Sequence, residues 1–423
     1  MTGANVIGRQ RDVLSSSKRT SWVVLVLGAV TFVVLAWVLI PWHPYPGGPL
    51  ELPDERDVFT PEQLERMLAY SGAARWISRA SLLASLVVAC VLGFTPLGRR
   101  LVARLRGPWL LRVLLAVAVV TLLGWVATLP FGVAIHRLQV RYGLSRQAWT
   151  PWLTDSLLNQ AVGIVTTSLA LLALFACIRL GRRWWPAVAA ALVAGLVVLG
   201  SFVYPVVVEP LFNDFEPLPR GQLRTEVMAI AEREGVDLDD VLVVDASRRT
   251  TSLNAYVTGF GSTRRVVLYD NLVDSQRTAA ARGAVLSVVA HELAHAKHDD
   301  VLVGTVIGAA GAVAGVGLLG VLLSYRRQDQ YATPEGVPML LAIFALASVL
   351  AMPVENGLSR QVEARADVDA LHATGDLKSF VRLQHDLGVR SLSDPSPQAW
   401  SQWWFGSHPT TLQRIAIAHR VLD

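Results

Sequence analysis

The residues best suited to chemistry lie in the motif His291-Glu292-Leu293-Ala294-His295, which follows a helix-forming run. Residues four apart lie on one face of a helix, so the two histidines can bind the same metal ion. Two imidazoles with a glutamate between them are typical of a zinc hydrolase. Glu292 is the expected general base, which takes a proton from the attacking water and returns it to the leaving amine. A chance pentapeptide is the alternative, because a short motif carries little information by itself.

A catalytic zinc site needs a third protein ligand, and Glu363 is the candidate. It lies in a polar helical stretch directly after an apolar run. Asp367 follows one turn later on the same face, where it can accept the remaining ring N–H of a ligand histidine. The alternative is a solvated helix face on which Glu363 pairs with Arg360. The prediction is one Zn²⁺ per chain, held by His291, His295 and Glu363. Three residues are expected to support these ligands: Asp367, Arg360 and Asp299.

The composition places these motifs in a membrane protein. Of the 423 residues, 52% are hydrophobic and only 17% are charged, which is too apolar for a soluble chain of this length. A helix needs about 20 apolar residues to cross the hydrocarbon core. Seven stretches meet that criterion: 22–41, 80–97, 109–135, 160–178, 186–208, 301–324 and 337–356. The first is too long for a cleaved signal peptide and is expected to remain as an anchor.

Two blocks of soluble character interrupt the apolar runs and contain the metal motifs. The first block predicts an amphipathic helix, short strands and a second helix, over 223–235, 241–244, 255–260, 266–269 and 279–298. The second block predicts polar helices over 358–374, 377–388 and 409–421. The expected fold class is mainly α, a seven-span helical membrane protein with an α+β zinc domain.

The chain is expected to divide into four parts, because apolar and polar blocks alternate. These are an amino-terminal membrane region at 1–208, the first part of the zinc domain at 209–300, two further spans at 301–356, and the second part of the zinc domain at 357–423. The sixth span contains several small residues that would let another helix approach closely, among them Gly311, Gly317 and Gly320. Helix packing is the preferred explanation for these glycines.

Charge and cysteine usage restrict the function further. The net charge of +5 comes mostly from arginines that flank the apolar runs, so nucleic-acid binding is not expected. Cys90 and Cys177 lie inside apolar runs and offer neither a disulfide framework nor a cysteine-based zinc site. The arginine distribution places the amino terminus in the cytoplasm. With seven spans, both soluble blocks then face away from the cytoplasm, and the expected location is a bacterial plasma membrane.

The motifs resemble those of the integral-membrane zinc-dependent CaaX prenyl proteases and their bacterial relatives. The similarity includes the metal motifs at 291–295 and 359–367 and covers nearly the whole chain in order and spacing. Further similar stretches are 142–146, 210–219, 252–260 and 265–270. The resemblance implies a barrel of seven helices around a water-filled chamber, capped by a thermolysin-like zinc domain. It does not predict an oligomeric state.

The resemblance also implies a substrate strand. Asn254, Ala255 and Tyr256 would lie on an edge strand, where an extended peptide can bind by strand addition. An ordinary strand end is the alternative, since edge strands need no ligand.

Two residues near the carboxyl terminus are implied by the same resemblance. His408 would donate a hydrogen bond to the oxyanion of the transition state, and Arg414 would orient Asp367 or Glu363 or bind a substrate carboxylate. The alternative is that His408 only caps or packs beside the helix that follows Pro409.

The expected function is a metalloendopeptidase that acts on membrane-associated, prenylated or unfolded peptides. Eukaryotic members of the similar family act on prenylated cysteines from the cytosolic face, whereas the arginine distribution here places the site outside the cytoplasm. An intramembrane site-2-type zinc protease is one alternative, but its Asp-Gly pair in a later apolar helix is missing. A transporter or scaffold with a structural metal site is the other, although structural zinc normally has four protein ligands.

Overall fold

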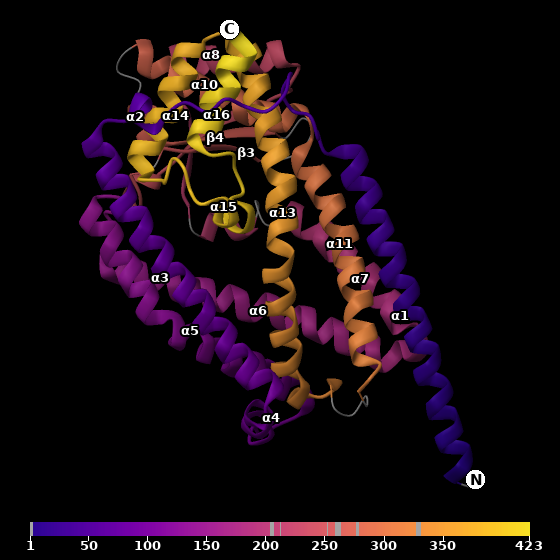
Figure 1. Cartoon of the computed structure of the whole chain (residues 1–423). Coiled ribbons are helices and arrows are strands. Elements are labelled where there is room, and N and C mark those ends of the chain that lie inside the picture. Colours follow the sequence, from indigo (N-terminus) through magenta and orange to yellow (C-terminus); the bar gives the residue numbers. More distant parts are fainter. Residues whose placement is uncertain are drawn as a thin grey trace.

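The computed structural model describes residues 3–203, 207–211, 213–251, 253–258, 264–275, 279–326 and 331–423. Long helices run along the molecule, and a smaller mixed domain lies at the end that holds the carboxyl terminus (Figure 1). Within these residues, seven helices are long and apolar enough to span a membrane. They are α1 (Gly3–Leu39), α3 (Pro61–Phe94), α5 (Trp109–Tyr142), α6 (Trp149–Gly181), α7 (Trp185–Val203), α11 (Asp300–Leu323) and α13 (Val337–Thr374). The seven predicted spans and the predicted fold class are confirmed.

The helices extend beyond the predicted apolar runs because their polar ends also carry helix signals. α3 begins at Pro61, where the Thr60 side chain accepts a hydrogen bond from the Gln63 backbone and the Gln63 side chain accepts one from the Thr60 backbone. This capping box satisfies N–H groups that the first helical turn leaves without partners. α5 ends before Gly143, whose φ of 77° is a left-handed conformation that glycine adopts without steric cost.

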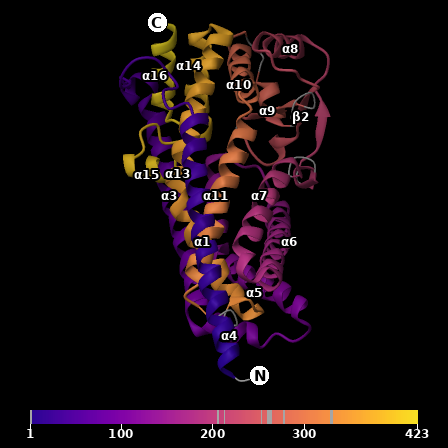
Figure 2. The same cartoon turned by 90° about the vertical axis from the view of Figure 1, so that its right-hand side faces the viewer.

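The spanning helices form a closed ring. Contacts run from α11 to α7, α6, α5, α3 and α13, and α13 returns to α11. α1 packs along α11 and α7, and α1, α11 and α13 lie nearly parallel in the second view (Figure 2). α1 and α11 approach closely at Gly317, where a Cβ would overlap the backbone of Leu25. The ring agrees with the predicted barrel, and the contact at Gly317 confirms a packing role for this glycine of the sixth span.

The mixed domain contains a four-stranded sheet and helices from both soluble blocks. The strand order is β1 (Phe215–Pro217), β2 (Asp240–Val244), β4 (Arg265–Tyr269) and β3 (Ala255–Thr258). β2 and β4 are parallel, and the other pairs are antiparallel. Three strands match the predicted ones, but residues 259 and 260 of the second predicted strand lie outside the described residues. β1 was not predicted, because it is short and ends at a proline.

The sheet packs against α10 (Ala279–Lys297), which in turn packs against α8 (Gln222–Glu234) and α14 (Leu377–Ser391), and α16 (Thr411–Leu422) packs against α14. Their shared core includes the fully buried Val227, Leu268, Val289, Leu293 and Phe380. Each such side chain contributes about 1.5–3 kcal/mol through burial. The core therefore joins the two soluble blocks, which the sixth and seventh spans separate in the sequence. The described residues also contain four shorter α-helices: α2 (Glu55–Val58), α4 (Pro96–Ala103), α9 (Asp270–Asp274) and α15 (Ala399–Phe405).

α13 connects the membrane region directly to the mixed domain. It is one continuous helix over Val337–Thr374 with Pro353 in its interior, and it runs nearly the whole length of the molecule (Figure 1). The division predicted between residues 356 and 357 therefore falls inside this helix. Because α13 is continuous, the polar stretch that contains Glu363 is a rigid extension of a membrane span.

Candidate active site

The helix α10 positions the two histidines. Val285, Val289 and Leu293 recur every four residues and are buried in the domain core, which fixes the rotation of the helix. His291 and His295 then lie on another side of α10, where their side chains are 9% and 18% exposed. Their rings stand almost perpendicular, with centroids 4.8 Å apart. The motif thus holds two imidazoles in a protected position without using them for core packing.

The three predicted ligands converge. His291 Nε2 lies 3.2 Å from His295 Nε2 and 3.2 Å from Glu363 Oε2, while His295 Nε2 lies 3.7 Å from Glu363 Oε1. Tetrahedral zinc with bonds of 2.0–2.1 Å places its ligand atoms about 3.4 Å apart. Glu363 Oε2 is buried and has no hydrogen-bond partner among the described residues. An orphaned carboxylate oxygen that faces two imidazole nitrogens fits a cation between them.

Two aspartates hold the other nitrogens of these rings. Asp367 Oδ1 lies 3.0 Å from His291 Nδ1, and Asp300 Oδ2 lies 2.9 Å from His295 Nδ1. Each contact favours a proton on Nδ1, which leaves Nε2 with a free lone pair toward the site. Arg414 hydrogen-bonds to both oxygens of the fully buried Asp367, and Arg365 pairs with Asp300. Of the roles considered for Arg414, the structure places it on Asp367.

Asp300, not Asp299, contacts the ligand histidine. Asp299 lies between α10 and α11 and interrupts the helical backbone with a φ of 53°, in the left-handed region. Its side chain pairs with Arg264. This turn brings the next residue, Asp300, back to His295. The sequence predicted Asp299 as a supporting residue, but the contact with the ligand histidine is made by its neighbour Asp300. The spacing of five residues between His295 and Asp300 could have indicated this contact, but the contact forms only because the backbone turns at Asp299.

The charges around the three ligands also suit a divalent cation. Four carboxylates and two guanidinium groups meet here, which leaves two negative charges in excess: Glu292, Glu363, Asp367 and Asp300 against Arg414 and Arg365. Burial lowers the pKa of His291, but the carboxylates of Asp367 and Glu363 beside its ring outweigh burial and raise that pKa to about 10. Without a metal, the site thus binds a proton strongly. The same preference for positive charge favours a metal cation.

Glu292 borders this cluster without belonging to the ligand set. Burial raises the pKa of its carboxyl group, while the neighbouring His291 and His295 act in the opposite direction. Among the described residues, none forms a hydrogen bond or an ion pair with the Glu292 carboxylate. A carboxylate with a raised pKa and free lone pairs is a stronger proton acceptor than an ordinary glutamate and can take a proton from water.

Arg360 is not a partner of Glu363. Its guanidinium donates hydrogen bonds to the backbone carbonyls of Gln402, at 3.1 Å, and Gly406. Gln402 Nε2 in turn donates to the carbonyl of His408 at 2.7 Å. His408 Nε2 lies 3.3 Å from Glu363 Oε2, and its side chain is 56% exposed. Arg360 therefore supports α15 and the following loop, which place His408 on the open side of the site. Arg360 was predicted to support the metal ligands, but it contacts the loop before His408 and not the ligand Glu363, so any support is indirect.

The substrate strand predicted around Asn254, Ala255 and Tyr256 lies at the sheet edge. β3 is the last strand in the sheet and pairs with β4 on one side only. Tyr269 donates its backbone N–H to the carbonyl of Asn254 at 3.1 Å, and Ala255 is buried. β3 also contacts α10, the helix that carries the histidines. An extended peptide added to this edge would therefore lie near the metal ligands.

Comparison with known proteins identifies the family. The family described as CAAX prenyl protease N-terminal, five membrane helices, matches residues 50–214, and peptidase family M48 matches residues 217–421. The chain belongs to peptidase family M48. It is therefore a metalloprotease of the membrane-bound CAAX prenyl protease type, and the predicted resemblance and enzyme class are confirmed. M48 membership also implies the metal for which the His-His-Glu site is suited.

Relatives of this M48 peptidase occur in bacteria and eukaryotes. It is 27% identical over 314 residues to the uncharacterized metalloprotease YhfN of Bacillus subtilis (strain 168), which covers 72% of each chain. It is 25% identical over 304 residues to the CAAX prenyl protease 1 homolog of Oryza sativa subsp. japonica, covering 69% of each chain. The crystal structure of S. mikatae Ste24p superimposes with a TM-score of 0.74 at 20% identity, over 94% of this chain and 99% of that one. This likeness shows a shared fold.

Proposed function

We propose that this chain is a zinc-dependent endopeptidase that cleaves extended, membrane-associated peptides. The observation that carries the proposal is the convergence of His291, His295 and Glu363, with the Glu292 carboxylate beside them. Zinc, when bound, would polarise the scissile carbonyl and acidify the attacking water. Glu292 would accept the proton of that water and deliver it to the leaving amine nitrogen. β3 would align the peptide by backbone hydrogen bonds.

The geometry disfavours the two alternatives that the sequence left open. α10 carries the histidines but is not among the helices that could span a membrane in the described part of the chain. That placement argues against an intramembrane protease. Three protein ligands leave a coordination position for water, whereas a structural zinc site is normally closed by a fourth. Among the described residues, three side chains form this group, which favours catalysis over a scaffold role.

The proposal is tested with the purified chain and two peptide sets that differ only in a prenyl group on a cysteine near the carboxyl terminus. Each set is incubated with and without a zinc chelator, and products are identified by mass spectrometry. We expect chelator-sensitive cleavage of both sets, since the site lies at the end of the membrane region where lipidated and unlipidated segments can reach it. Cleavage of the prenylated set alone would narrow the substrate class. Stoichiometric zinc without cleavage of either set would favour a structural metal.

A test of His408 separates a catalytic role from packing. Partial desolvation of the half-exposed ring lowers the pKa of His408, so the ring is neutral near pH 7 and keeps one N–H donor. If this donor binds the developing oxyanion, His408→Ala should reduce turnover about 100-fold or more with zinc content retained. The measurement is steady-state cleavage of an identified peptide with metal analysis of the same sample. His419→Ala is the control, because the His419 side chain is exposed near the end of α16 and pairs with Asp423. Turnover within a few-fold of wild type would make His408 structural.

The membrane orientation gives a second prediction. The arginine distribution places residue 106 in the cytoplasm and the mixed domain outside it. After Cys90 and Cys177 are replaced by alanine, a cysteine at the exposed Glu232 should react with an impermeant maleimide in intact spheroplasts. A cysteine at the exposed Arg106 should react only after lysis. The reverse pattern would place the active site in the cytoplasm.

A further inference from the structure

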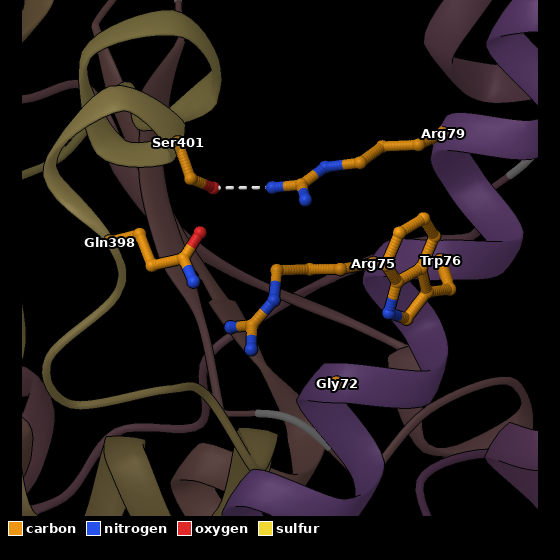
Figure 3. A pocket seen from close by; sticks show the side chains of 6 residues that line it. All are labelled: Gly72, Arg75, Trp76, Arg79, Gln398 and Ser401. Atoms are coloured by element: carbon orange, nitrogen blue, oxygen red, sulfur yellow. Dashed lines mark hydrogen bonds between the residues drawn. The ribbon is translucent and has the colours of Figure 1, made fainter.

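A small pocket separates the membrane helix α3 from α15. It has a volume of about 120 Å³ and lies away from the metal ligands. Four lining residues come from α3 and two from the start of α15: Gly72, Arg75, Trp76, Arg79, Gln398 and Ser401 (Figure 3). Both arginine side chains reach from α3 toward the α15 side. The pocket is therefore a polar recess on a membrane helix.

The pocket contains one guanidinium group whose charge is not neutralised. Arg75 pairs with Asp394, a carboxylate that is 11% exposed. Arg79 donates to Ser401 Oγ at 2.6 Å and lies over the Trp400 ring, 4.5 Å from its centroid. In the described part of the chain, no carboxylate forms an ion pair with Arg79. Ser401 engages one of the five N–H donors of Arg79, so the others remain available to an anion.

An exposed apolar stripe of α3 borders the pocket at Trp76. Trp76, Leu83, Val87 and Val91 are all exposed, Trp76 by 74%. At about 100° per residue they lie within a sector of about 80°. The opposite side of the helix, about 140° to 200° from Trp76, carries serines: Ser78, Ser81 and Ser85. An exposed, purely apolar stripe on a spanning helix faces the acyl chains.

Arg79 lies at the edge of that stripe and at the depth of the headgroups. By the same geometry, Arg79 is about 60° from Trp76 around the helix. It is also the last charged residue before the uncharged run 80–94. Trp76 stands at the polar end of the stripe. Two tryptophans of α15, Trp400 and Trp403, are also exposed. Tryptophans at the end of an apolar stripe mark the membrane–water interface.

We propose that this pocket binds the phosphate of an anionic phospholipid. The guanidinium of Arg79 presents forked donors that match phosphate oxygens, and the indole of Trp76 suits the headgroup region. The acyl chains would extend along Leu83 and Val87. Because α15 leads to the loop that carries His408, a lipid held here would contact the support of the active site without touching the metal ligands. A free phosphate or a peptide carboxylate would use the same donor but would not need the apolar stripe.

The test measures lipid retention by the purified full-length chain. Native mass spectrometry would count bound dioleoyl-phosphatidylglycerol and dioleoyl-phosphatidylcholine after identical delipidation, with soluble glycerol phosphate as competitor. We expect phosphatidylglycerol to be retained selectively. Arg79→Gln should lower that retention about fivefold, the effect of one charge near an anionic surface. Arg233→Gln removes the same charge from an exposed position on α8 and should leave retention unchanged.

Further variants separate lipid binding from a structural role of Arg79. Ser401→Ala removes the contact between Arg79 and α15 but keeps the guanidinium, so it should retain phosphatidylglycerol as wild type does. Trp76→Ala, at a largely exposed position, should lower retention without disturbing packing. Equal retention of both lipids would overturn the proposal. So would displacement of the lipid by glycerol phosphate, which would indicate a site for soluble anions, or an equal loss in Ser401→Ala and Arg79→Gln.

Discussion

Glu292→Gln is expected to abolish peptide cleavage while zinc remains bound. The substitution removes the group proposed to accept the proton from water but leaves His291, His295 and Glu363 in place. General base catalysis contributes about 10²- to 10⁴-fold, so turnover should fall by at least about 100-fold. Zinc content is measured by atomic spectroscopy on the sample used for turnover. Glu232→Gln is the matched control, because Glu232 is exposed on α8. Full activity in Glu292→Gln would remove Glu292 from the proposed mechanism.

The same variant should separate activity from stability. Burial raises the pKa of Glu292 in the folded, metal-free protein, so above that pKa the ionised carboxylate destabilises the folded state. Glutamine is neutral and has nearly the same shape. The metal-free Glu292→Gln protein should therefore have a melting temperature equal to or above that of wild type at neutral pH. A lower melting temperature would show that Glu292 stabilises the fold, and the loss of activity would then have a second explanation.

The candidate metal ligands could be proposed from the sequence because much of their geometry is local. Histidines four apart on a helix face the same way, and Asp367 lies one turn beyond Glu363, as helical spacing requires. The membrane spans were equally predictable, since a run of about 20 apolar residues usually indicates a helix that crosses the bilayer. Placing Glu363 beside His291, 72 positions earlier in the sequence, required instead the chemical argument that catalytic zinc needs a third ligand.

The sequence failed where contacts depend on irregular backbone. Asp300 reaches His295 only because Asp299 adopts a left-handed conformation, which no local pattern announced. Arg360 was expected beside Glu363 because the two are three residues apart on a helix. Its long side chain instead donates to the backbone carbonyls of Gln402 and Gly406. α15 itself was not predicted, because its run of aromatic residues has neither a cap nor a helical period. Supporting residues were thus harder to predict than ligands.

Glu363→Ala is expected to remove both metal and activity. It deletes one of three ligands, and it opens the buried position that the carboxylate occupies between two imidazole nitrogens. A supporting residue behaves differently: loss of such a contact lowers metal affinity about 10- to 100-fold but leaves the coordination set complete. Asp367→Asn should therefore bind zinc weakly and regain activity at high zinc concentration. Glu363→Ala should stay inactive at every zinc concentration that does not inhibit wild type.

The informative comparison is a zinc titration of both variants, followed by turnover at each point. Recovery in Asp367→Asn without recovery in Glu363→Ala would separate support from ligation. Stoichiometric zinc in Glu363→Ala would contradict the assignment and point to a substitute ligand. His408 is the residue to test then, because its Nε2 lies 3.3 Å from Glu363 Oε2 and could approach a metal once the carboxylate is gone. If zinc is lost only in the double variant Glu363→Ala/His408→Ala, His408 can replace Glu363, and the loop supported by Arg360 adapts to the metal.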